Sequence, residues 1–210
     1  KSGNTYTLNG EFLVKEGATL NIEPGVKIVA QYDDRVDYIL VEQGAKINAL
    51  GTASAPIIMT SSKEEPGAWG GIHICGRAHT NAEGGKGSSE IGGATYGGSN
   101  DADNSGVLKY VRVEYTGYAF DEEHEANALH FYGVGNGTII ETCEAYHGSD
   151  DGFEFFGGSV NVKNMVVVNC SDDSFDWTEG WNGKGENLVA YQESASTLGY
   201  DCDCLIEADN

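Results

Sequence analysis

Basic residues, prolines and long apolar runs are scarce in this chain, and each shortage excludes a class of protein. Lys and Arg number 12 against 33 Asp and Glu, for a net charge of −21. That balance disfavours nucleic acid or an anionic membrane surface as a direct partner. No apolar run approaches the ~20 residues of a transmembrane helix, so no transmembrane segment is predicted. Cations are the natural counterpart of such an acidic chain.

Cysteine is also sparse, and its pattern excludes common metal sites. The five cysteines match no CxxC spacing, and their odd number leaves at least one unpaired. Cys202 and Cys204 lie too close in an extended strand for an easy mutual disulfide, because alternate residues of a strand are held ~6–7 Å apart. We therefore expect isolated thiols that pack as small apolar residues.

Glycine, by contrast, is abundant, and the sequence repeats. Thirty glycines with three prolines indicate an all-β chain, and the length fits one domain over residues 1–210. Residues 147–155 and 169–177 are nearly the same, offset by 22 residues (172 − 150), and residues 12–25 and 39–51 form a second pair offset by 27 (39 − 12). These offsets predict a single-stranded right-handed parallel β-helix of about eight coils, each stacked on the one before.

The alternation within the repeats predicts which side chains face out. Extending the alignment pairs four triplets, Leu129-His130-Phe131, Phe153-Glu154-Phe155, Phe175-Asp176-Trp177 and Ile206-Glu207-Ala208. Burying the three carboxylates without partners would cost far more than burying aromatic rings gains, so the apolar pairs face the core. His130, Glu154, Asp176 and Glu207 then form an outward column with neighbours about 4.8 Å apart.

Other segments complete the predicted solenoid. Residues 110–114, 142–146, 164–168 and 187–191 align as a second stacked sheet, in which Arg112 and Glu144 are outward neighbours that should pair. Residues 76–106 break the rhythm with Gly, Ser, Asn and Asp, and are interpreted as a loop projecting from one corner. Its Asp101 and Asp103 are candidate Ca²⁺ ligands, although the segment lacks the Gly and Glu spacing of a helix-loop-helix calcium site, which favours a flexible polar loop. Residues 121–125 predict an acidic turn.

Several motifs together resemble a known family. Residues 17–28, the Trp-Gly-Gly-Ile strand at 69–72, residues 96–106 and the Ser-Asp-Asp-Gly-Phe-Glu repeat are similar to secreted or surface right-handed β-helix proteins of the pectate-lyase-like superfamily, common in Bacteroidetes-type and marine bacteria. The resemblance covers nearly the whole chain. It implies a secreted or cell-surface bacterial protein whose targeting segment is not in this sequence. Relatives continue beyond the Ile-Glu-Ala-Asp-Asn motif at 206–210, so the chain is expected to be part of a longer protein.

The outward column is the sharpest functional candidate. Two unit charges ~5 Å apart repel by roughly 1 kcal/mol in water and by several times that near a low-dielectric surface. The column should therefore raise a carboxyl pKa, or attract a cation or protonated His130. Asp150, Asp172 and Asp176 are candidate ligands for Ca²⁺ here, and a solvated acidic face is the alternative.

The Asp-Asp pairs at the corner before each column strand allow a second interpretation. Asp150, Asp151, Asp172 and Asp173 are candidate general acids and bases for sugar hydrolysis. The first pair is similar to the Asp-Asp of polygalacturonases, whose Gly-His-Gly and Arg-Ile-Lys elements have no counterpart here. Alternatively the aspartates cap the turns by accepting backbone hydrogen bonds. Trp181 and Tyr200 are candidate platforms for sugar rings, unless Trp181 covers the core edge.

Two classes of function stay open. The first is an extracellular or cell-surface acidic binding and structural module, stabilised by Ca²⁺, that holds a polysaccharide or a surface protein. The second is a polysaccharide-active hydrolase or lyase that uses the Asp-Asp pairs. Because residues 206–210 supply no cap for the apolar stack, we also expect an unsealed last coil that meets a continuing chain or another copy end to end.

Overall fold

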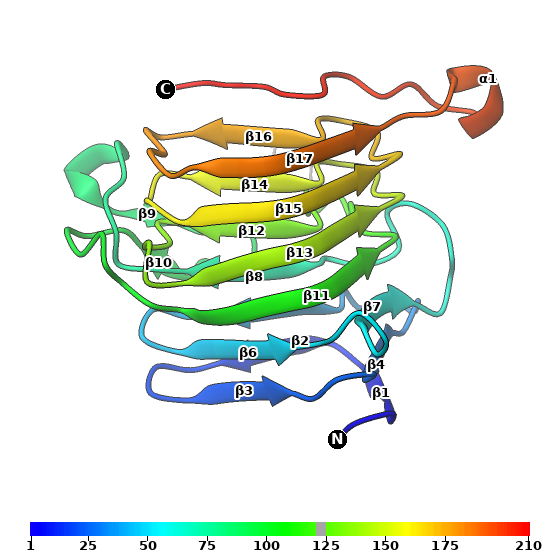
Figure 1. The fold of residues 1–210 in the computed structure, drawn as a ribbon, viewed down its shortest axis with the longest axis horizontal. Coiled ribbons are helices and arrows are strands. Elements are labelled where there is room, and N and C mark those ends of the chain that lie inside the picture. The colour runs from blue at the N-terminus through cyan, green and yellow to red at the C-terminus, as the bar shows by residue number, and fades with distance from the viewer. Residues whose placement is uncertain (121–124) are drawn as a thin grey trace.

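A computed structural model describes residues 1–120 and 125–210. Apart from Glu125, the acidic turn expected at 121–125 therefore lies outside the described residues. The chain is a right-handed parallel β-helix, as expected. Figure 1 shows its strands stacked as rungs from the N-terminus at one end to the C-terminus at the other.

Two parallel sheets make the walls of the coil. The six-stranded sheet has the order β16-β14-β12-β8-β5-β2 and comprises β2 (Glu11–Val14), β5 (Tyr38–Val41), β8 (Ile72–Cys75), β12 (Leu129–Tyr132), β14 (Phe153–Phe156) and β16 (Phe175–Thr178). The nine-stranded sheet comprises β1 (Thr5–Leu8), β3 (Thr19–Ile22), β4 (Lys27–Ala30), β6 (Lys46–Leu50), β7 (Ile57–Ser61), β11 (Gly106–Glu114), β13 (Ile139–Tyr146), β15 (Asn161–Val168) and β17 (Gly185–Tyr191).

The pairing register reproduces the sequence offsets. Phe12 on β2 pairs with Ile39 on β5, which is the 27-residue shift, and Phe153 on β14 pairs with Phe175 on β16, which is the 22-residue shift. Six rungs belong to the six-stranded sheet, and the bridge from Phe175 to Ile206 adds another. The coils therefore stack in the register that the repeats predict.

The core fills with the side chains that the alternation turned inward. Phe131 stacks on Phe155 with ring centroids 5.0 Å apart, and Phe153 stacks on Phe175 at 5.7 Å. The inward residues of β11, β13 and β15 are buried in the same cluster. Cys75, Cys143 and Cys170 are buried free thiols, as expected of cysteines that pack as small apolar residues. Cys202 and Cys204 are also free thiols, but Cys202 is half-buried and Cys204 is exposed, so the expectation of packed thiols is wrong for Cys204.

The long strands β11, β13, β15 and β17 each bend at a residue with positive φ. These residues are Tyr110, Thr142, Asn164 and Asn187, one above the other in the register. The left-handed conformation is tolerated best by Gly and Asn. The side chains of Asn164 and Asn187 also hydrogen-bond to each other at 2.9 Å. The bend lets one strand serve two walls of the coil.

The outer face of the six-stranded sheet is partly covered by other segments of the chain, and this corrects two expectations. Segment 76–106 contains the short helix η1 (Glu83–Gly85) and the antiparallel pair β9 (Gly87–Ser88) and β10 (Thr95–Tyr96), and leaves the stack of coils at one side. It does not simply project, because its Ile91 and Tyr96 are buried against Tyr132 and Phe156 of the sheet. His130, expected on an open surface, is 0 % exposed under this layer.

Past β17 the chain makes the short helix α1 (Ala195–Leu198), none of whose residues is buried, and returns across β16. The returning C-terminal segment hydrogen-bonds to β16 through the backbone N–H groups of Glu207 and Asp209. Leu205 and Ile206 remain 51 % and 54 % exposed. The expected end-to-end contact at this coil stays a prediction.

Close stacking of the coils should make one glycine indispensable. A Cβ at Gly106 (φ +117°) would lie 2.0 Å from the Ile47 carbonyl oxygen, whereas a Cβ at Gly17 (φ +79°) would meet nothing within 4 Å. Gly17→Ala should cost about 1–2 kcal/mol from its backbone conformation alone. Gly106→Ala should cost more than about 3 kcal/mol. Urea unfolding of both variants checks this, and equal losses would contradict it.

Candidate functional site

An acidic pocket of about 250 Å³ opens on the outer face of the six-stranded sheet. Every side chain that lines it is a carboxylate except one, and the lining residues are Glu90, Glu125, Asn127, Asp150, Asp151, Glu154, Asp172, Asp176 and Glu207. Eight carboxylates and no described basic residue thus surround one small space.

Three parts of the fold supply these groups. Glu154 on β14 pairs with Asp176 on β16, and Glu207 follows the residue that pairs with Phe175, so the predicted acidic column exists. The corner before each strand adds Asp150, Asp151 and Asp172. The segments that cover the sheet contribute the remaining groups, Glu90, Glu125 and Asn127.

The second aspartate of each corner pair holds the next coil. Asn127 Oδ1 accepts the backbone N–H of Asp151 at 3.1 Å, Asp151 Oδ1 accepts that of Asp173 at 2.9 Å, and Asp173 Oδ1 accepts that of Cys204 at 2.7 Å. This corner ladder, formed by Asn127, Asp151, Asp173 and Cys204, supports the turn-capping interpretation for Asp151 and Asp173. Asp150 and Asp172 stand outside it.

Burial and mutual repulsion raise the carboxyl pKa values of the pocket. Asp150 is 8 % exposed, and burial, with the charges of Glu125 and Asp172, raises its pKa to about 7. Asp151 is 7 % exposed, and burial, with the charge of Asp150, raises its pKa to about 9. Some carboxyl groups of the pocket thus keep their protons near neutral pH, because ionising all of them would place several negative charges close together away from water.

Glu154 and Asp176 share a hydrogen bond at the centre of the pocket. Burial, with the charges of Asp151 and Glu90, raises the pKa of Glu154 well above its usual range. Its carboxyl group also accepts the Asn127 side-chain N–H. The pKa of Asp176 is also raised, because the effect of burial is larger than the opposing effect of the hydrogen bond from Glu154. Asp176 Oδ1 is a buried oxygen without a hydrogen-bond partner among the described residues. The pocket therefore holds an acceptor that the protein does not satisfy.

The carboxylates come close enough to share a cation. Within each of three overlapping sets the ligand atoms lie within 4.8 Å of one another, namely Asp150-Asp151-Asp172, Asp151-Glu154-Asp176 and Asp173-Asp176-Glu207. Two oxygens bound on opposite sides of one Ca²⁺ are about 5 Å apart. Of the predicted metal ligands, the structure thus brings Asp150, Asp172 and Asp176 together.

His130 does not act as the counter-charge that the sequence suggested. Its imidazole stacks on His73 at 4.2 Å and on Tyr132 at 5.3 Å. Burial lowers the pKa of His130 to about 3, so the ring is neutral near physiological pH. The carboxylates must be balanced by protons or by a cation from solution.

Trp181 and Tyr200 do not line the pocket. Trp181 stacks on Phe155 at 4.6 Å and donates its Nε1–H to the Val160 carbonyl oxygen, so it covers the core edge. The Tyr200 hydroxyl donates to the Asn169 carbonyl oxygen at 2.8 Å, near His147. Both were candidates for a binding face. Packing covers one face of the Trp181 ring, and Tyr200 lies outside the pocket with its hydroxyl hydrogen-bonded.

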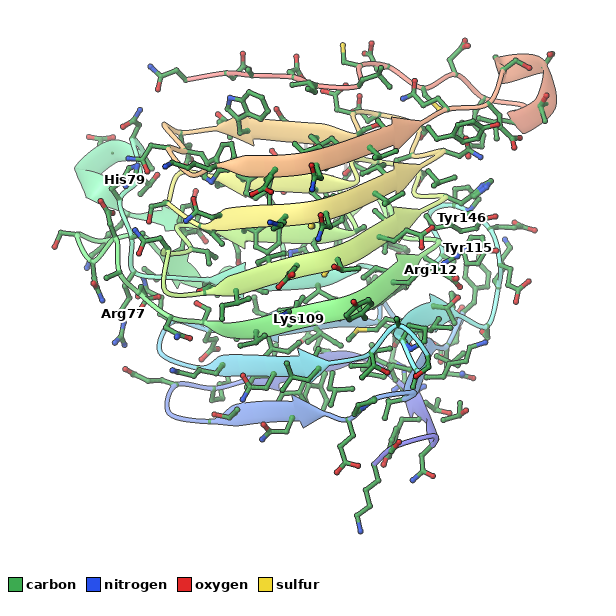
Figure 2. The ribbon with its side chains drawn as sticks, in the orientation of Figure 1. Arg77, His79, Lys109, Arg112, Tyr115 and Tyr146 are labelled. Carbon is green, nitrogen blue, oxygen red and sulfur yellow. The ribbon has the colours of Figure 1, made fainter. Side chains whose placement is uncertain are left out.

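Asp101 and Asp103 are likewise placed elsewhere. Asp101 accepts from the ring Nδ1 and the backbone N–H of His79, at 2.8 and 3.1 Å, and Asp103 accepts the backbone N–H of Arg77. Figure 2 shows Arg77 and His79 at one side of the stack of coils, between its two ends. These two aspartates therefore fasten segment 76–106 and belong to none of the clusters in the described chain that could hold a metal.

Cationic side chains are engaged away from the pocket. Arg112 lies beside Tyr146 on the nine-stranded sheet (Figure 2), with its guanidinium carbon 4.1 Å from that ring centroid. Its Nε is 2.6 Å from Glu114, and its Nη1 is 3.5 Å from Glu144, which confirms the predicted pair. Arg112 therefore does not neutralise the carboxylates of the pocket.

Sequence reasoning missed Glu90, Glu125 and Asn127. Glu90 and Glu125 come from irregular segments with no period to align. Asn127 carried a usable signal, because it stands two residues before Leu129 as Asp151 stands two before Phe153. Extending the alignment to that position would have placed an amide in the corner ladder.

Comparison with known proteins agrees with the architecture. No curated protein matches this chain. None of the described helices is long and apolar enough to cross a membrane. The sequence matches the pectate-lyase like beta helix domain over residues 1–210. Because that match spans the whole sequence and the stacked parallel rungs bear it out, the chain belongs to the family of pectate-lyase like beta helix domains.

Proposed function

We propose that this protein is a cation-binding β-helix module whose acidic pocket takes Ca²⁺. The observation that carries the proposal is the sharing of carboxylates between neighbouring sets, with Asp151 and Asp176 each belonging to two of the three. Oxygen-only sets of this density are the ligands that Ca²⁺ prefers. The unsatisfied Asp176 Oδ1 supports the same conclusion, because an ion would give it a partner.

The setting we propose is the bacterial cell surface or the medium around it. Extracellular calcium modules commonly bind with Kd values of roughly 10⁻⁴–10⁻³ M. A stiff solenoid with an ion-loaded face suits the display of a binding surface to a polysaccharide or a surface protein. The net charge of −21 supports a cation as the first ligand of that face.

The spacing of the carboxylates favours binding over hydrolysis. Retaining and inverting glycosidases separate their two carboxyl groups by about 5–5.5 Å and 6.5–9.5 Å, which leaves room for the sugar or for water. In the Asp150-Asp151-Asp172 set one oxygen of each carboxylate lies within 4.8 Å of the other two, which is the spacing of ligands around a single Ca²⁺. Such closeness suits one shared ion.

Calcium should stabilise the fold beyond any effect of ionic strength. At a hundred times its Kd a ligand adds about 2.7 kcal/mol to the free energy of unfolding. For a chain of this size that gain corresponds to roughly 5–10 °C in Tm. Thermal unfolding in CaCl₂ and in NaCl of equal ionic strength measures the difference.

The variant Asp172→Asn/Asp176→Asn should lose most of that calcium-specific rise. Asp34→Asn/Glu83→Gln is the matched control, since it removes the same charge from exposed positions outside the pocket, and it should keep the rise. Identical responses to calcium and sodium in the wild type would show that the face is only a solvated acidic surface.

Without metal, stability should fall as pH rises from 7 to 9. The pKa of Asp151 is about 9 in the folded chain against 3.8 ordinarily, so in this range the folded state binds more protons than the unfolded state. The neutral His130 opposes this trend only below its ordinary pKa of 6.5. Urea unfolding in EDTA at pH 7, 8 and 9 tests the slope.

The pH series also separates protons from calcium. Because the ion displaces the retained protons, the calcium-induced rise in Tm should grow between pH 7 and 9. Asp151→Asn should flatten the metal-free slope, and Asp34→Asn should not. A metal-free stability that rises over this range would contradict the raised pKa.

One observation favours an enzyme as the second candidate. A carboxyl group with a pKa of about 7, as burial gives Asp150, is suited to general acid catalysis near neutral pH. If the pocket hydrolyses or cleaves a polysaccharide, a panel of neutral and acidic polysaccharides should reveal activity that Asp150→Asn reduces at least about a hundredfold. Activity unchanged by this substitution would exclude Asp150 as the acid.

A further inference from the structure

The buried imidazole of His130 stands directly behind the acidic pocket. It is 0 % exposed, and its Nδ1 makes no hydrogen bond within the described residues. Its Nε2 accepts the Asn127 backbone N–H over a long 3.3 Å. Stacking on His73 and Tyr132 holds the ring in place, whereas its hydrogen bonding is weak for a buried polar group.

Nε2 faces two carboxylates that other groups hold in place. Glu90 Oε2 lies 3.4 Å from Nε2. One ligand atom each of Glu90, His130 and Glu154 lies within 4.8 Å of the other two. The Tyr132 hydroxyl donates to Glu90 at 3.2 Å, and the Asn127 side chain donates to Glu154. Second hydrogen bonds of this kind orient the ligands of metal sites.

The three donors differ in kind from those at the front of the pocket. One imidazole nitrogen with two carboxylates suits a borderline transition-metal ion, whereas oxygen alone suits Ca²⁺. Donors of a tetrahedral Zn²⁺ site, bound at about 2.0–2.2 Å, lie about 3.4 Å apart. The separation between Nε2 and Glu90 Oε2 has that value.

We propose that Glu90, His130 and Glu154 form a rear subsite that binds a transition-metal ion of the Zn²⁺ class. The rear subsite shares Glu154 with the calcium pocket and so rests on the proposed function, but its nitrogen donor is its own. The ion takes the Nε2 lone pair in place of the long hydrogen bond from Asn127. The pocket then holds two ions of different chemistry, bridged by Glu154.

The chain offers a matched control in His73. This ring is also 0 % exposed and stacks on His130 and Tyr132, but its Nε2 bonds to the Gly70 carbonyl oxygen at 2.7 Å. It belongs to none of the potential metal clusters of the described chain. His73→Phe and His130→Phe thus disturb the same buried stack, and only the second removes a proposed ligand.

The test is titration of the metal-stripped protein with Zn²⁺ by calorimetry in saturating Ca²⁺. Wild type and His73→Phe should bind one Zn²⁺ that calcium does not displace. His130→Phe and Glu90→Gln should each weaken binding at least about tenfold. Titration with Co²⁺ should give the strong visible absorption of a four-coordinate site containing nitrogen, absent from both ligand variants.

The calcium-induced rise in Tm, measured on every variant, separates this proposal from the proposed function. If His130→Phe and Glu90→Gln keep wild-type Zn²⁺ affinity, or if Ca²⁺ displaces Zn²⁺ freely, the rear subsite is wrong while the calcium pocket stands. Loss of Zn²⁺ binding in His79→Ala would likewise overturn it, by assigning the ion to the His79–Asp101 pair. Zn²⁺ binding without any calcium-induced rise in Tm would contradict the proposed calcium pocket and leave the rear subsite standing.

Discussion

Parallel stacking at a fixed spacing of about 4.8 Å governs this molecule. Whatever occupies a position in one coil lies against its counterpart in the next, so a repeated sequence stacks like on like. Facing inward, this gives the aromatic stacks of Phe131 on Phe155 and Phe153 on Phe175. Facing outward, the same rule brings Glu154 and Asp176 together. The backbone cannot separate these charges, and only protons, donors or cations can balance them.

The outward column changes character along the solenoid, and the covering layer explains why this matters. In register order it runs Leu13, Leu40, His73, His130, Glu154 and Asp176. The apolar and imidazole members are covered by segment 76–106 and its neighbours, whereas the acidic members line a pocket at the edge of that cover. Carboxylates at such a boundary are partly removed from water yet reachable by ions. Burial at this boundary raises the pKa values of the carboxyl groups, and it also strengthens the attraction between the ionised carboxylates and a cation.

Sequence reasoning reached as far as periodicity extends. Register, core and acidic column follow from residues that repeat every 22 or 27 positions, because a slip by one residue would bury carboxylates. The burial of His130 could not be predicted from the repeats, because irregular segments cover it. Those segments pack on the sheet through Ile91 and Tyr96, which follow no period. For the same reason the sequence did not predict that Glu90 would line the pocket. Trp181 and Tyr200 looked like ligand platforms because a sequence does not show which faces of a ring are already occupied.

The two aspartates of each repeated Asp-Asp pair have different structural roles. The second aspartate of each pair bonds to the backbone of the next coil, so its position is fixed by the need to join rungs. The same carboxylate of Asp151 also belongs to the set with Glu154 and Asp176. The first aspartate makes no such link and is carried to the pocket wall by its neighbour. Turn capping and the proposed ion binding are therefore compatible explanations of the motif, because the capping hydrogen bonds fix the corner at which the carboxylates of successive coils converge.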